Sequence, residues 1–179
     1  MTTLSLDPRR TALVLIDLMP RIVALETAPL SGPEVLERCV ALAKATRSVG
    51  GLVVNVRVER PGVGSQPDGS GFAPELAPQP GDVEIVKGTV GAFGRTGLDE
   101  ELRRRDIGTV ALAGIATNFG VESTGRGADD LGYETVYITD AMTGLDQDAH
   151  DFALSYVFPR FGSLCSGTEY VAALSASAS

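Results

Sequence analysis

Residues 109–124 read TVALAGIATNFGVEST, and the interpretation of the whole chain starts from this stretch. Val110 to Ala113 form a continuous apolar run, which is typical of a strand buried on both faces of a parallel sheet. A helical pattern follows from about Phe119. Backbone N–H groups at the start of a helix have no partner within the helix, and they bind anions or a developing oxyanion. The turn therefore predicts an anion-binding site at Gly120, where nucleophilic enzymes often carry Cys or Ser.

Short apolar runs alternate with segments of helical periodicity along the chain. We expect strands at 11–16, 52–58, 83–86, 109–113, 135–138 and 162–165. We expect helices at 34–49, 98–105, 120–131, 146–156 and from 166 onward. Strands and helices that alternate in this way form right-handed βαβ units. The pattern therefore predicts an α/β fold, a single-domain Rossmann-like three-layer sandwich with a mostly parallel sheet of about six strands.

The domain organisation follows from length and composition. A chain of 179 residues suffices for one domain with a full core, so we expect one domain over residues 1–179. Residues 61–81 contain five Gly and five Pro, which a core helix or central strand does not tolerate. We expect a long surface loop there, either a binding loop or a flexible insert. We expect the tail at 175–179 to be frayed.

The composition narrows the classes of partner. A net charge of −8 and a pI near 4.6 argue against nucleic acid or an anionic membrane as a partner. The sequence has neither an apolar signal core nor a run approaching about 18 apolar residues, so we expect a cytoplasmic protein that does not enter a membrane. Cys39 and Cys165 are far apart and form no CxxC pattern, so we expect both to be reduced.

Polar features follow three of the expected strands directly. Asp17 ends the first strand, Lys87 ends the short strand at 83–86, and the turn 117–120 follows the strand at 109–113. Parallel strands present their carboxyl ends at one edge of the sheet, and ligands bind in the crevice at that edge. We therefore expect Asp17, Lys87 and the turn to share one site.

Four segments carry a resemblance to a known family. They are LVLIDL at 13–18, EIVKGTVGAF at 84–93, GIATNFGVESTGRGADDLGY at 114–133 and FPRFG at 158–162. Together they are similar to the isochorismatase-like hydrolase superfamily, which includes nicotinamidases, carbamoyl amidohydrolases and isochorismatase. In most of this superfamily an Asp, a Lys and a Cys form a triad. Asp17 and Lys87 match the first two members of the triad.

The resemblance also defines the rest of the expected site. Gly120 falls where the family carries its Cys, and a non-proline cis peptide is implied at Ile115–Ala116. The resemblance implies that the N–H groups of Ala116 and Gly120 point at a substrate oxygen. Further expected substrate contacts are Thr117, Asn118 and Phe93. Asn118 alternatively caps the following helix, and Phe93 alternatively packs in the core.

A glycine at this position excludes an acyl-enzyme on residue 120. Isochorismatase itself also has Gly here and cleaves a vinyl ether without a covalent intermediate. We therefore expect a hydrolase acting on a small molecule, with Asp17 as general acid or base and Lys87 as its electrostatic partner. Burial raises the pKa of a carboxyl group and a nearby ammonium lowers it, so Asp17 is an acid in the first case and a base in the second. The alternative is a catalytically inactive small-molecule binding protein on a hydrolase fold.

The sequence also gives expectations about metals, cofactors and the oligomeric state. Nicotinamidases hold a metal with an Asp/His cluster, whereas His150 is the single histidine here, so we expect no metal. We expect His150 to lie on the surface or to pack a helix. No GxGxxG follows the first strand, so a dinucleotide is not indicated. We expect no cofactor. The resemblance implies a homodimer or homotetramer.

Overall fold

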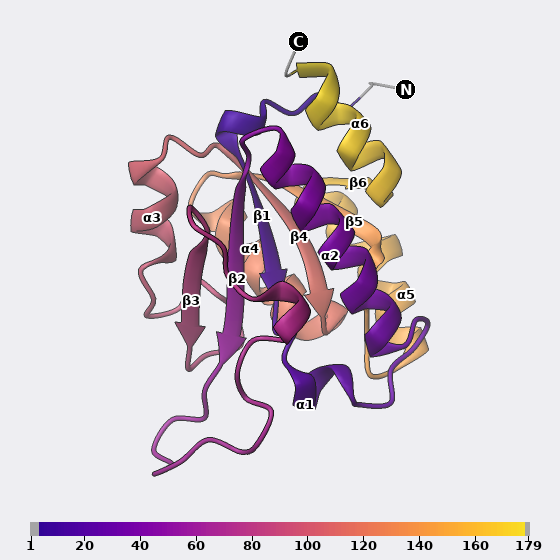
Figure 1. Cartoon of the computed structure of the whole chain (residues 1–179). Helices are drawn as coiled ribbons and strands as arrows, with labels where there is room; N and C mark the ends of the chain where they lie inside the picture. The colour runs from indigo at the N-terminus through magenta and orange to yellow at the C-terminus, as the bar shows by residue number, and fades with distance from the viewer. Residues whose placement is uncertain (1–3, 178–179) are drawn as a thin grey trace.

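The structure, a computed structural model, describes residues 4–177 and contains one parallel sheet of six strands (Figure 1). The strand order is β3-β2-β1-β4-β5-β6, and every neighbouring pair is parallel. The strands are β1 (Thr11–Ile16), β2 (Leu52–Val58), β3 (Val83–Lys87), β4 (Thr109–Ile115), β5 (Glu134–Thr143) and β6 (Ser163–Cys165). This confirms the predicted α/β fold with a Rossmann-like parallel sheet.

Helices cover both faces of the sheet (Figure 1). The α-helices are α1 (Pro20–Val23), α2 (Gly32–Ser48), α3 (Leu98–Arg104), α4 (Glu122–Asp130), α5 (Gln147–Phe152) and α6 (Gly167–Ser177). Short 3₁₀ turns are η1 (Pro8–Arg10), η2 (Pro74–Leu76) and η5 (Phe158–Arg160), and π-helical turns are η3 (Thr117–Val121) and η4 (Ala153–Val157).

Two apolar cores lie on opposite faces of the sheet. Leu13 and Leu15 of β1 face α2 and α6, whereas Val14 and Ile16 face the layer that contains α3, α4 and η4. Successive side chains of a strand point to opposite faces, so a strand buried on both sides is apolar throughout. All six residues of β1 are buried.

Side chains cap the helices at the positions that the sequence favours. Ser31 and Glu34 form a capping box at the start of α2, and each binds the other residue's backbone N–H. Asp146 accepts a hydrogen bond from the N–H of Ala149 at the start of α5. These caps fix where the chain leaves the loops and enters the helical layers.

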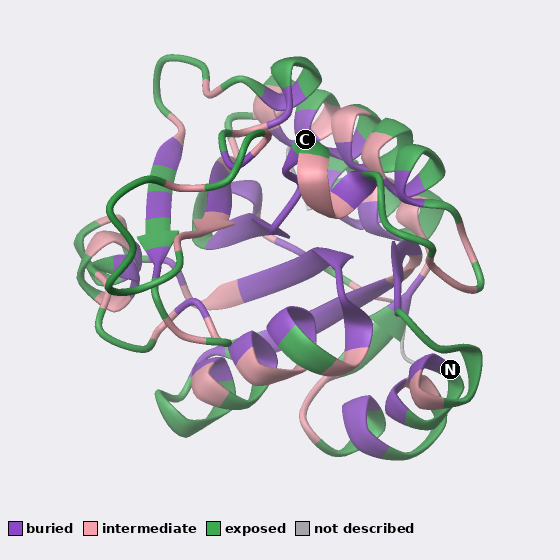
Figure 2. Cartoon of the chain, turned by 90° about the horizontal axis from the view of Figure 1, so that it is seen from below, coloured by how far each residue is buried: buried purple, intermediate pink, exposed green. Residues whose placement is uncertain are grey.

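The strand order reverses between β1 and β4, which lie side by side at the centre of the sheet. The chain therefore leaves the carboxyl ends of these two strands toward different parts of the molecule, and this opens a crevice between them. Figure 2 looks onto this edge, where buried strand ends meet a ring of more exposed loops. Asp17, which follows β1, and the turn that follows β4 both leave the sheet at this edge.

Four elements differ from the sequence-based expectations. The tail expected to be frayed at 175–179 is helical as far as Ser177, the end of α6, and residues 178–179 lie outside the described part of the chain. β5 extends to Thr143, past the expected end at 138, and its register with β4 shifts between Leu112 and Gly114. The short helix α1 was not expected. The 61–81 segment is not wholly a surface loop, because it contains η2 and buries Leu76, and the N–H of Ala73 donates to the carbonyl of Leu18.

Candidate active site at the ends of strands β1, β3 and β4

Asp17 follows β1 directly and has a left-handed backbone, with φ of 52°. Asp adopts this region more readily than most residues. The N–H of Asp17 continues the β1–β2 pairing by donating to the carbonyl of Val56 at 2.9 Å, and the N–H of Met19 donates back to the carbonyl of Asp17 at 2.8 Å. The chain thus turns sharply at Asp17, and its side chain lines a pocket at the crevice.

Lys87, the last residue of β3, reaches Asp17 across β2. Its ammonium donates to Oδ2 of Asp17 at 2.8 Å, to the carbonyl of Val90 at 2.8 Å and to the carbonyl of Thr89 at 3.3 Å. The three acceptors match the three N–H bonds of an ammonium. The Lys87 side chain is 2% exposed and that of Asp17 11%, so the ion pair is shielded from solvent.

Burial dominates the protonation of Asp17. Its pKa lies above the ordinary value because burial disfavours the charged carboxylate. The charge and the hydrogen bond of Lys87 oppose this rise in pKa, and the charge of Arg21 opposes it further. Among residues 4–177, no group pairs with Oδ1 of Asp17 although that oxygen is buried. The carboxyl group therefore has one oxygen held by Lys87 and one free for a proton or a ligand.

The turn after β4 approaches Asp17 from the other side of the crevice. The Ile115–Ala116 peptide is cis, as the family resemblance implies, and the π-helical turn η3 follows it. A Cβ on Gly120 would lie 3.3 Å from Oδ2 of Asp17 and 2.8 Å from Cγ2 of Ile16. A residue with a side chain would therefore crowd the carboxylate, and glycine leaves that space to the pocket.

Asp17, Lys87, Ala116 and Gly120 line one pocket of about 490 Å³, so the structure brings these four expected site residues together. Exposed apolar side chains form its outer walls, namely Leu25, Val90, Phe119 and Leu145. The charged residues Glu59 and Arg60 lie along another part of the lining. The pocket thus has a buried polar floor and a largely apolar wall, which is the usual character of a small-molecule site.

Thr117 and Phe93 are not among the residues that line this pocket, and their expected substrate contacts stay predictions. Thr117 is fully buried, and its hydroxyl lies 2.8 Å from Nδ1 of His150. Phe93 stacks on Tyr133 with ring centroids 5.8 Å apart, so its packing role is the one that the structure supports. His150 is itself buried and ties α5 to η3, which agrees with a helix-packing role.

Asn118 also lies outside the pocket lining. It belongs to the π-helical turn η3, whose N-cap is Ala116, so it is not a helix cap. Its Oδ1 is buried and has no hydrogen-bond partner among the described residues. The expected substrate contact of Asn118 therefore stays a prediction.

A buried hydroxyl that sequence reasoning missed links the two halves of the site. Thr124 of α4 donates to the carbonyl of Gly120 at 2.6 Å and accepts from the N–H of Ala92 at 3.0 Å. Ala92 belongs to the loop whose carbonyls at 89 and 90 hold Lys87. Thr124 stands four residues after Gly120, and this spacing was the only signal in the sequence.

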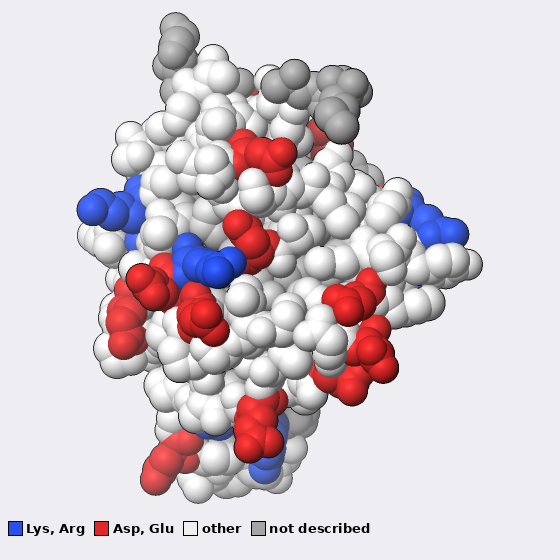
Figure 3. Space-filling view, turned by 90° about the vertical axis from the view of Figure 1, so that its right-hand side faces the viewer, with Lys and Arg blue, Asp and Glu red and all other residues white. Residues whose placement is uncertain are grey.

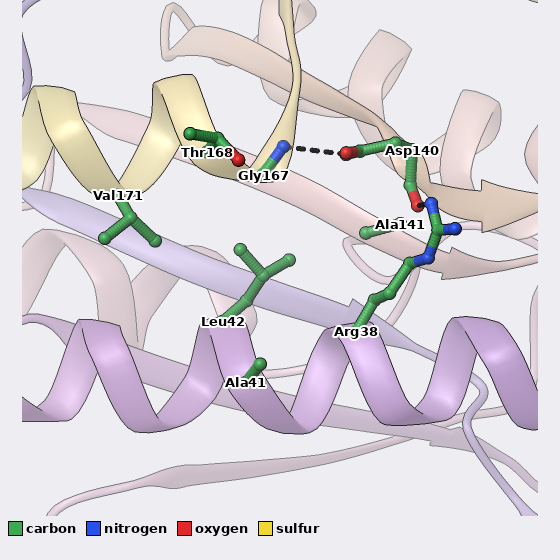
Figure 4. Close-up of a pocket in the computed structure, with 8 residues that line it drawn as sticks. All are labelled: Arg38, Ala41, Leu42, Asp140, Ala141, Gly167, Thr168 and Val171. Atoms are coloured by element: carbon green, nitrogen blue, oxygen red, sulfur yellow. Dashed lines mark hydrogen bonds between the residues drawn. The ribbon is translucent and has the colours of Figure 1, made fainter.

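A second pocket of about 410 Å³ lies between α2 and α6 (Figure 4). Arg38 donates there to the carbonyl of Asp140 at 2.6 Å, and Oδ1 of Asp140 accepts from the N–H of Gly167 at 2.7 Å. Arg38, Asp140 and Gly167 therefore bind one another, while Leu42 and Val171 supply apolar surface. The pocket at the strand ends, with its unpartnered carboxylate oxygen, is the better candidate for chemistry.

Comparison with known proteins decides the family. The family model described as "Isochorismatase domain" matches residues 11–169. The chain belongs to the isochorismatase family. The isochorismatase family protein YwoC of Bacillus subtilis (strain 168) is 41% identical over 179 residues, covering 90% of this chain and 93% of YwoC.

A solved structure and a curated relative add to this comparison. The structure of an isochorismatase family protein from Burkholderia thailandensis superposes with a TM-score of 0.90 at 38% identity, covering 97% of this chain and 100% of that one. The ureidoacrylate amidohydrolase RutB of Agrobacterium fabrum is 40% identical over 87 residues, which cover 49% of this chain and 38% of RutB. The chain is thus a member of a hydrolase family that acts on small molecules.

The structure adds three observations about other classes of partner. Within residues 4–177 no helix has the length and apolarity needed to cross a membrane. In the same part of the chain, no group of three or more His, Cys, Asp or Glu side chains is arranged to hold a metal ion. On the face drawn in Figure 3, basic side chains stand apart from one another among acidic and uncharged ones. A metal-free and cofactor-free reaction stays a prediction, as do the homo-oligomer and the cytoplasmic location.

Proposed function

We propose that this chain hydrolyses a small molecule without a cysteine nucleophile, with Asp17 as the general acid and an enol (vinyl) ether as the bond broken. One observation carries the proposal. Oδ1 of Asp17 is buried and unpartnered among the described residues, while Oδ2 is held by Lys87 and faces the space that a side chain on residue 120 would fill.

The absence of a thiol in the pocket supports non-covalent chemistry. Cys39 and Cys165 are free but buried, and neither lines the pocket. Burial raises the pKa of the Cys165 thiol to about 12 and also raises that of Cys39, so neither forms the reactive thiolate readily. Lys87 is equally unsuited as a nucleophile, because its ammonium already donates to three oxygen atoms.

The environment of Asp17 supports an acid rather than a base. Burial raises its pKa, so the protonated form persists to higher pH than in an ordinary aspartate. A proton on Oδ1 is compatible with the contacts present, since Oδ2 accepts from Lys87 and Oδ1 has no other partner among the described residues. A general acid of this kind typically contributes about 10²–10⁴ in rate.

The proposed reaction balances with water as the only co-substrate. Asp17 gives its proton to the terminal carbon of the C=C–O–R group, and the electron pair of the double bond forms the new C–H bond. Water adds to the resulting oxocarbenium carbon and returns a proton to Asp17. The hemiketal then breaks its bond to the OR group, and its hydroxyl proton moves to the departing oxygen. The products are an alcohol and a carbonyl compound.

The other residues have supporting roles in this proposal. The Lys87 ammonium stabilises the carboxylate that Asp17 becomes after proton transfer. The N–H groups of Ala116 and Gly120 bind the substrate oxygen at the start of η3, where helical N–H groups lack internal partners. Each such donor typically contributes about 10²–10³ in rate.

The test is turnover of isochorismate, of simpler enol ethers and of a panel of amides that includes ureidoacrylate. Wild-type protein is compared with Asp17→Asn and Lys87→Ala, and circular dichroism checks the fold of each variant. We expect enol-ether hydrolysis that Asp17→Asn reduces by about 10²–10⁴.

Other outcomes discriminate between reactions. Equal rates in all three proteins would refute the proposal. Turnover of amides alone would assign Asp17 as the base that activates water. Tight binding of a panel member without product would instead support the alternative, a binding protein on a hydrolase fold.

A further inference from the structure

Arg60 is an unpaired cation at the candidate substrate pocket. Among the arginines of residues 4–177, all except Arg60 and Arg95 have an ion-pair or hydrogen-bond partner for the guanidinium. Of these two, Arg60 lines the pocket and Arg95 does not. The chain has a net charge of −8, so most of its cations have acidic partners available. An arginine that stays unpaired at the pocket therefore points to an anionic ligand.

The backbone of Arg60 is fixed on both sides. The N–H of Arg60 donates to Oε1 of Gln66 at 2.8 Å, and Nε2 of Gln66 donates to the carbonyl of Arg60 at 3.0 Å. One residue earlier, the N–H of Glu59 donates to the carbonyl of Lys87 at 2.9 Å. These bonds anchor the start of the long loop to the end of β3, next to the ion pair of Lys87 and Asp17.

Glu59, the acidic residue next to Arg60 in the sequence, pairs with a different arginine. The carboxylate of Glu59 accepts from Nη1 of Arg57 at 2.5 Å, and Arg57 also lies over the ring of Phe72. Glu59 is thereby paired with Arg57, and among the described residues no ion pair joins it to Arg60. The positive charge of Arg60 is left available to a ligand in the pocket.

We propose that Arg60 binds a carboxylate of the substrate, so that the pocket selects small carboxylic acids whose reacting bond lies over Asp17. A guanidinium presents two parallel N–H donors that match the two oxygens of a carboxylate. The apolar walls, including Phe119 and Leu145, accommodate the uncharged body of such a molecule. The inference rests on the proposed function only in taking this pocket as the substrate site.

The test compares two probes of nearly the same shape, cinnamate and the neutral cinnamamide, by isothermal titration calorimetry. The proteins are wild type, Arg60→Gln and Arg95→Gln. The last variant is a matched control, because it removes an equally unpaired charge outside the pocket. We expect Arg60→Gln to weaken cinnamate binding by about tenfold or more, as for other charge-assisted hydrogen bonds. Cinnamamide affinity should be the same in all three proteins.

Three results would overturn the inference. They are equal cinnamate affinity in wild type and Arg60→Gln, equal weakening by Arg60→Gln and Arg95→Gln, and no saturable binding of millimolar cinnamate to wild type. Failure of the proposed reaction can be distinguished from failure of the carboxylate site. Arg60-dependent cinnamate binding in a protein that turns over no substrate would refute the reaction alone, whereas turnover of a carboxylate-bearing substrate such as isochorismate that Arg60→Gln leaves unaffected would refute the carboxylate site alone.

Discussion

Lys87 holds one oxygen of Asp17 at 2.8 Å and leaves the other oxygen without a partner among the described residues. In the proposed reaction this asymmetry gives the two oxygens different roles. Oδ2 fixes the orientation of the carboxyl group, and Oδ1 exchanges the proton. The pKa of Asp17 reflects the same balance, because burial raises it and Lys87 lowers it.

Lys87→Met should raise the pKa of Asp17 further, because the substitution removes the cation that lowers it and retains the burial that raises it. For a general acid, kcat falls as pH rises through this pKa, so the falling limb of the pH–rate profile should move to higher pH in the variant. NMR titration of the Asp17 carboxyl carbon checks the pKa without any substrate. A lower pKa in Lys87→Met would contradict the balance described above.

Gly120→Ala should destabilise the protein and obstruct the pocket. The new methyl group would lie 2.8 Å from Cγ2 of the fully buried Ile16 and 3.3 Å from Oδ2 of Asp17. Overpacking of this kind typically costs about 1–3 kcal/mol in the free energy of unfolding. Urea denaturation measures the loss, and Gly71→Ala is the control because nothing lies within 4 Å of its new methyl group. Equal stabilities of the two variants would show that residue 120 has room for a side chain.

Much of this site is predictable from sequence, because the positions of its main residues are set by the ends of the predicted strands. β1 and β4 are apolar along their lengths, and parallel pairing places their carboxyl ends at the same edge. Asp17 follows β1, Lys87 ends β3, and Gly120 lies in the turn after β4. Their convergence at one edge therefore follows from the strand order without any knowledge of side-chain packing. Their chemical roles stay predictions.

The features that sequence reasoning missed depend on tertiary packing. Thr117 is the first residue of the turn, but its hydroxyl contacts His150, because the π-helical turn sets the direction of its side chain. Phe93 lies in a loop without periodicity, where nothing in the pattern indicates that it stacks on Tyr133. The helix α1 has four residues, too few to show a helical period. Arg60 is one of two arginines among the described residues whose guanidinium has no partner, and only the folded chain shows that it lines the pocket whereas Arg95 does not.

Thr124→Val should loosen the connection between the turn at Gly120 and the loop that holds Lys87. Valine has nearly the same shape as threonine, but it leaves the buried N–H of Ala92 without its acceptor, at a cost of about 1–3 kcal/mol. Thr124→Ser retains the hydroxyl and should restore most of the bond. Hydrogen exchange at the Ala92 amide, measured by NMR, should accelerate in Thr124→Val and not in Thr124→Ser. Equal exchange in both variants would remove the bridging role.

His150 should make the protein less stable in mild acid. Burial lowers the pKa of His150, and the charge of Asp151 only partly opposes this. In the unfolded chain the pKa returns to about 6.5, so below that pH the unfolded state binds more protons than the folded state. The contribution of His150 is therefore fully favourable above about pH 6.5 and declines as the pH falls, by at most about 1.4 kcal/mol per pH unit.

The measurement compares urea unfolding of wild type and His150→Asn between about pH 7.5 and pH 5.5, a window that brackets the unfolded-state pKa. Asparagine retains a polar group near the hydroxyl of Thr117 but does not titrate, so subtracting its curve removes the contribution of all other groups. Wild type should lose stability relative to the variant as the pH falls. Parallel curves would mean that His150 gains its proton equally well in the folded protein, and the buried bond to Thr117 would then not hold the imidazole neutral.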